Sequence, residues 1–82
     1  MNLTSDERKW KESTESELRT ISEMWAKNFT YKQLRAFQSS YVLYMQKPEV
    51  SDEQYQAYNN MWQTATWAID FQYFGQRVGY GK

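Results

Sequence analysis

Side chains that perform acid–base or nucleophilic chemistry near neutral pH are scarce in this 82-residue chain, which contains no His and no Cys. Catalysis needs a group that titrates near neutral pH or an activated nucleophile. The sequence has no glycine-rich loop before a helical segment that could hold a phosphate. Apart from Asp70, its acidic residues are either interleaved with Lys and Arg or placed at the start of a predicted helix. We therefore expect no enzyme activity, no catalytic residue, no metal site and no cofactor.

Aromatic side chains are the groups best able to form a specific contact, and they concentrate between Tyr55 and Phe74. This stretch contains two of the four Trp, three of the seven Tyr and two of the four Phe, and Asp70 is its only charged residue. On a helix that turns about 100° per residue, positions 55, 58, 62, 65 and 69 form one apolar stripe. Trp67, Phe71 and Phe74 form a second, aromatic stripe on roughly the opposite side.

This second stripe has two explanations. It is either part of the core, covered by another segment of the chain, or a docking surface, because a contiguous exposed aromatic patch usually marks an interaction site. Protein interfaces are enriched in Tyr, Trp, Phe, Met and Arg, and we base the functional prediction on the second explanation. The predicted partner-binding residues are Trp67, Asp70, Phe71, Phe74, Arg77 and Tyr80.

Asp70 also has two interpretations. It is a solvent-facing acid that keeps the helix soluble, or it anchors a salt bridge to Arg77 or to an Arg of a partner at an otherwise aromatic interface. The second aromatic stripe, with Asp70 beside it, favours a non-catalytic regulator or inhibitor that acts by occupying the surface of another protein. Small stoichiometric regulators encoded by bacterial viruses have a similar size and composition, so a viral origin is part of this hypothesis by analogy.

A nucleic-acid-binding module is the alternative function. Tyr31, Lys32, Arg35 and Lys47 interleave basic and aromatic residues, which single-strand binders use for phosphate contact and base stacking. The formal net charge of the chain is zero, whereas nucleic-acid-binding domains usually have a strong basic patch. The nucleic-acid hypothesis is therefore the weaker of the two.

A structural homo-oligomer is the third hypothesis. A single domain of this size buries only about 60% of its unfolded surface, and without Cys it has no disulfide to stabilise it. An aromatic core or association with another chain could supply the missing stability. The partner is accordingly another protein or a second copy of the chain.

The apolar segments also bear on location. No apolar run approaches the roughly 20 residues that cross a bilayer, and the first residues contain no apolar region of a secretory signal. We therefore expect no membrane contact and a cytoplasmic protein.

The elements that position these residues are predicted to be helices, in a single all-α domain. We expect a small three-helix bundle, or a helical hairpin with an added N-terminal helix. The predicted helices span residues 5–29, 31–46 and 52–74, and residues 76–82 are expected to form a mobile tail.

Capping residues set these boundaries. Ser5 is expected to cap the first helix, without a full capping box. Thr30 with Gln33 and Ser51 with Gln54 form capping boxes for the second and third helices. The only proline, Pro48, ends the second helix, and Gly75 is the expected residue after the end of the third.

Overall fold

Four helices make up the part of the chain that the computed structural model describes, residues 3–78 with side chains as far as Phe74. They are α1 (Ser5–Glu12), α2 (Glu15–Asn28), α3 (Tyr31–Met45) and α4 (Asp52–Val78), and these residues contain no strand. The all-α helical bundle expected from the sequence is confirmed.

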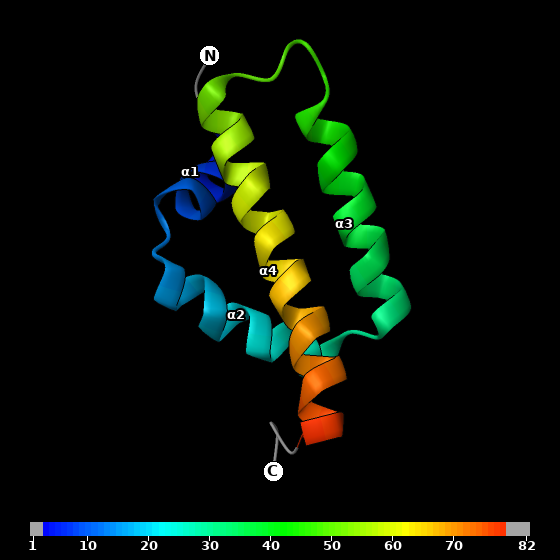
Figure 1. Ribbon diagram of the computed structural model, residues 1–82. Helices are drawn as coiled ribbons and strands as arrows, with labels where there is room; N and C mark the ends of the chain where they lie inside the picture. Colours follow the sequence, from blue (N-terminus) through cyan, green and yellow to red (C-terminus); the bar gives the residue numbers. More distant parts are fainter. Residues whose placement is uncertain (1–2, 79–82) are drawn as a thin grey trace.

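The long helix α4 is the element against which each of the other three helices packs. It runs between α3 on one side and α1 and α2 on the other (Figure 1). The short connection of residues 46–51 turns the chain back, so α3 and α4 form an antiparallel hairpin. Residues from α4 therefore reach every other part of the bundle.

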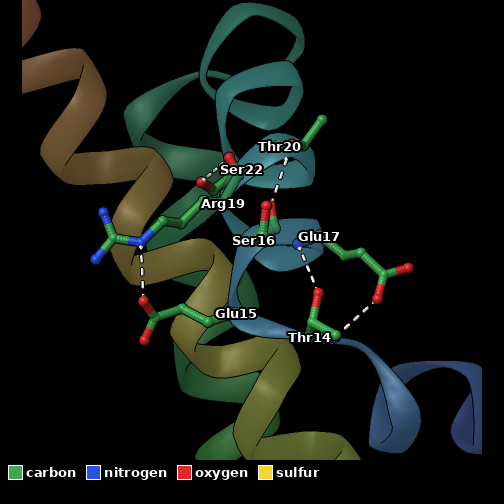
Figure 2. Close-up of polar contacts among 7 residues, drawn as sticks. All are labelled: Thr14, Glu15, Ser16, Glu17, Arg19, Thr20 and Ser22. Atoms are coloured by element: carbon green, nitrogen blue, oxygen red, sulfur yellow. Dashed lines mark hydrogen bonds and ion pairs between the residues drawn. The ribbon is translucent and has the colours of Figure 1, made fainter.

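The predicted single helix over residues 5–29 is wrong, because the chain breaks at Ser13 and Thr14 into α1 and α2. Thr14 caps α2 through a full capping box with Glu17, in which each side chain accepts a hydrogen bond from the other's backbone N–H (Figure 2). The break also changes the packing. In a continuous helix Trp10 and Trp25 would lie about 22 Å apart, whereas their ring centroids are 5.7 Å apart.

The start of α1 also differs from the prediction. Thr4, not Ser5, is the N-cap residue, and it forms a full capping box with Glu7. The pattern of Thr followed three residues later by Glu was present in the sequence. The boxes predicted at Thr30 and Ser51 are both formed, with Gln33 and Gln54 respectively.

The predicted end of the last helix at Phe74 is also wrong. α4 continues past Gly75 to Val78, so residues 76–78 are helical rather than part of a tail. One glycine costs a helix interior only about 1 kcal/mol relative to alanine, and no proline follows it to force an end. The remainder of the predicted tail, residues 79–82, lies outside the described residues.

The fully buried core consists of small and aliphatic side chains. Among the described residues, no Trp, Tyr or Phe is fully buried. The buried side of α4 carries alanines and Thr64, whose small side chains let the surrounding helices approach closely. Tyr55, which falls on the predicted core stripe, is instead half exposed. The buried apolar residues are Leu18, Leu34, Ala57, Ala65 and Ala68.

A chain of half-buried aromatic rings joins the other three helices. Trp10 of α1 contacts Trp25 of α2 edge to face, and Trp25 in turn contacts Phe29 and Phe37, with ring centroids 5.9 and 5.5 Å away. Phe37 continues the chain to Tyr41 along α3. These rings supply the bulk that the small buried core lacks.

Two amide side chains of α4 bind the C-terminal ends of α1 and α2. Asn60 Nδ2 donates to the Trp10 carbonyl oxygen at 2.8 Å. Gln72 Nε2 donates to the carbonyl oxygens of Ala26 and Phe29 at 3.0 and 2.6 Å. The last carbonyls of a helix have no partner within it. These side-chain hydrogen bonds therefore attach the C-terminal ends of α1 and α2 to α4.

Candidate functional site

The second aromatic stripe borders a hollow near the C-terminal end of α4. The hollow has a volume of about 250 Å³. Spacings of three and four residues along α4 bring its aromatic side chains onto one face. Its lining residues are Arg19 of α2 and Trp67, Asp70, Phe71 and Phe74 of α4. We call these five residues the aromatic site.

Arg19 enters the aromatic site from α2. Its guanidinium carbon lies 4.6 Å from the centroid of the Trp67 ring, and its Nε lies 3.5 Å from Oε2 of Glu15. Figure 2 shows the Arg19 and Glu15 side chains extending together from α2. A cation over an aromatic ring at an exposed position contributes about 0.5–1 kcal/mol. Arg19 therefore covers part of Trp67 while keeping its positive charge at the edge of the hollow.

Exposure increases along the stripe toward the end of α4. Trp67 and Phe71 are half-buried, whereas Phe74 is 47% exposed. Tyr73 beside it is 53% exposed, and the Tyr73 and Phe74 rings meet edge to face with centroids 5.1 Å apart. The first part of the stripe is thus partly covered by α2, and the last part faces solvent.

Asp70 provides the negative charge of the aromatic site and is exposed. Among the side chains that the structure describes, no Lys or Arg nitrogen lies within ion-pair distance of its carboxylate. The hollow therefore presents one carboxylate and one guanidinium beside three aromatic rings.

The structure brings four of the six predicted partner-binding residues together: Trp67, Asp70, Phe71 and Phe74. Arg77 belongs to the last turns of α4, but its side chain lies outside the described residues, as does all of Tyr80. The sequence analysis missed Arg19. The only signal for it was the i,i+4 spacing from Glu15, which says nothing of its position over Trp67.

The residues of the predicted nucleic-acid site do not converge. Tyr31, Lys32 and Arg35 are exposed in the first turns of α3. Lys47 lies beyond the opposite end of this 15-residue helix, which is about 22 Å long, and its Nζ lies 5.1 Å from the Tyr44 ring centroid. The structure therefore separates the basic residues of this candidate into two groups.

Two hydrogen-bonded titratable groups with shifted pKa values, Glu7 and Tyr58, lie away from the aromatic site, where α1 meets α4. The Tyr58 hydroxyl donates to Oε2 of the buried Glu7 at 2.7 Å. The backbone N–H of Thr4, followed by this hydroxyl, lowers the pKa of Glu7 below its usual range. The same bond to Glu7, followed by burial, raises the pKa of Tyr58 to about 12. Both groups are thus held in their ordinary neutral-pH forms, which suits a structural contact.

The ionisable groups of the aromatic site are the guanidinium of Arg19 and the exposed carboxylate of Asp70. Among the described residues, no three Asp or Glu side chains are grouped so that they could hold a metal ion. Within residues 3–78, none of the helices combines the length and apolar character needed to cross a bilayer.

Comparison of the chain with protein-family models, with curated proteins and with solved structures finds no match.

Proposed function

We propose that this protein is a non-catalytic regulator that binds another protein through the aromatic site and acts by occupying its surface. The observation that supports this function is the exposure of Phe74 beside a hollow lined by aromatic rings and two opposite charges. A small domain gains stability by covering such rings, so rings left at the surface indicate that they serve another contact.

The composition of the aromatic site is that of an interface centre. Trp, Tyr and Arg dominate the residues whose loss weakens protein complexes most, and these residues gather in pockets that become desolvated on binding. In the proposed complex, Phe74 and Phe71 are the aromatic anchors. Asp70 accepts a cationic side chain of the partner, and Arg19 holds the Trp67 ring in place.

The residue types of the chain favour a regulator that acts by covering the surface of its partner protein. Without His or Cys, the protein lacks the two side chains whose ordinary pKa values bring them closest to neutral pH and to nucleophilic reactivity. Its effect on a partner would then scale with the amount of complex formed. This is the behaviour of a stoichiometric regulator or inhibitor.

Site-specific photo-crosslinking tests the proposal. A benzophenone amino acid replaces Phe74 in one variant and Tyr31 in a second, in cells that naturally produce the chain. Tyr31 is a matched control, because it is 59% exposed on α3, outside the aromatic site. We expect a discrete protein adduct from position 74 that survives nuclease treatment, and none from position 31. Adducts from position 31 alone, or from neither position, would contradict the proposal.

A further inference from the structure

The aromatic site shows what its occupant must offer. The occupant needs apolar or aromatic side chains to cover Phe74, which is 47% exposed. It needs a cation for Asp70, whose carboxylate has no ion-pair partner among the described side chains. It also needs an anion for Arg19, whose contact with Glu15 is a single exposed ion pair at 3.5 Å. Exposed pairs of this kind contribute roughly 0–1 kcal/mol, so Arg19 can exchange this partner at little cost.

The aromatic site itself meets all three requirements. In a two-fold symmetric dimer, when residue i of one subunit contacts residue j of the other, residue j of the first also contacts residue i of the second. A two-fold axis that passes between Arg19 and Asp70 therefore sets each guanidinium opposite the other copy's carboxylate. The aromatic rings of the two copies then lie against one another around the axis.

We propose that, while the regulated protein is absent, the aromatic site binds a second copy of this chain, with Arg19 of each copy facing Asp70 of the other. This inference rests on the proposed function, because both complexes use the same site and self-association then competes with the other protein. The formal net charge of the chain is zero, so two copies meet without net electrostatic repulsion.

The small core of the monomer favours association, because a second chain can cover apolar surface that the monomer leaves exposed. The fully buried apolar side chains are two leucines and three alanines, and none of the described aromatic rings is fully buried. A second copy would bury the rings at the end of α4 and add stability that depends on protein concentration. The dimer also masks the aromatic site, so any other protein that binds there competes with self-association.

Charge exchange gives a sharp test, because the two pairs in the dimer are identical. Asp70→Arg alone places two arginines opposite each other at both positions, and Arg19→Asp alone places two aspartates there. An equimolar mixture of the two variants restores an Arg–Asp pair at both positions. The measurement is sedimentation equilibrium over about 1 μM to 1 mM, the range in which small interfaces dissociate.

We expect the wild-type chain to approach the dimer mass within this range. Each single variant should need at least about tenfold higher concentration to dimerise, and the mixture should recover the wild-type behaviour, since like charges set opposite each other disfavour association. Phe74→Ser, with Tyr31→Ser as its control, provides a variant that changes no charge: only Phe74→Ser should weaken the dimer.

A wild-type chain that stays monomeric at about 1 mM, which corresponds to negligible affinity, would overturn the second-copy inference. A dimer whose two charge variants do not restore each other would overturn it as well. If either result occurs while crosslinking from position 74 still yields an adduct with a different protein, the proposed function stands and the occupant is that protein. If position 74 also yields no adduct, both proposals fail.

Discussion

Among single residues, the pair of Glu7 and Tyr58 shows how this small protein uses a polar contact in place of apolar bulk. Glu7 makes two structural hydrogen bonds. One carboxylate oxygen accepts from the Thr4 backbone N–H in the capping box of α1, and the other accepts from the Tyr58 hydroxyl of α4. A charge-assisted hydrogen bond of this kind is roughly twice as strong as a neutral one. The pair therefore fixes α1 against α4 although α1 contributes no fully buried apolar side chain.

The Glu7–Tyr58 contact should limit the pH range in which α1 stays on α4. Folding raises the pKa of Tyr58 to about 12 from an ordinary value of 10.0, so its stabilisation is complete below 10.0 and is lost as the pH rises toward 12. Folding lowers the pKa of Glu7 from an ordinary value of 4.5, so its stabilisation is present above 4.5 and is lost as the pH falls through the folded value.

Tyrosinate absorbance during an alkaline titration measures this directly. We expect one tyrosine to ionise near pH 12 and this late step to disappear in Tyr58→Phe. The exposed Tyr55 on the same helix is the control, and Tyr55→Phe should leave the late step in place. Burial also raises the pKa of Tyr41, so the comparison is repeated with Tyr41→Phe present. A step near pH 12 that then survives Tyr58→Phe would show that Tyr58 is not held by Glu7.

Local signals at the residue scale were readable from the sequence. The four capping boxes all follow the pattern of Ser or Thr with Glu or Gln three residues later, and two of them, at Thr30 and Ser51, set helix starts in the prediction. Those at Thr4 and Thr14 carry the same signal. The box at Thr14 was missed because Trp10 and Thr14 continue backwards the helical spacing that begins at Leu18. That spacing alone suggested one uninterrupted helix.

Among the elements, α4 determines the arrangement by contacting all of the other three helices. The polar side chains of α4, as well as its apolar ones, contact the other three helices. Asn60 and Gln72 reach the carbonyl ends of α1 and α2, while Thr66 accepts a hydrogen bond from Gln38 of α3 at 2.8 Å. Hydropathy periodicity could not reveal these contacts, since a polar residue that caps a neighbouring helix looks like a solvated one.

The hydrogen bond of Asn60 to α1 predicts that Asn60 and its neighbour Asn59 contribute differently to the free energy of unfolding. Asn60→Ala removes the shorter of the two hydrogen bonds to the Trp10 carbonyl oxygen, the other coming from the Ser13 backbone N–H at 3.3 Å, and should lower the free energy of unfolding by about 0.5–1.5 kcal/mol. Asn59 is exposed, so Asn59→Ala should change it by less than about 0.5 kcal/mol. Urea unfolding of both variants measures the difference. Equal effects in the two variants would show that the Asn60–Trp10 bond contributes nothing.

For the whole molecule, the helical class and the aromatic character of the last helix could be predicted, but the composition of the site could not. The spacing of Trp67, Phe71 and Phe74 placed them on one face without any knowledge of the fold. Arg19 joins them because α2 crosses α4 after the break at Thr14, which is a tertiary event. For the nucleic-acid alternative the fold has the opposite effect. Its residues belong to one segment of the sequence, yet they lie toward opposite ends of α3.

The central claim is that the end of α4 is a docking surface and not a covered part of the core. The measurement that tests it most directly is urea unfolding of Phe74→Ser and Tyr31→Ser, with binding assayed for the same two variants by adduct formation from a photo-crosslinker at position 73, which is exposed beside Phe74. Both substitutions should change the free energy of unfolding by less than about 1 kcal/mol. Only Phe74→Ser should abolish the adduct. A loss of about 3–5 kcal/mol, as for a core phenylalanine, or an undiminished adduct in Phe74→Ser, would contradict the claim.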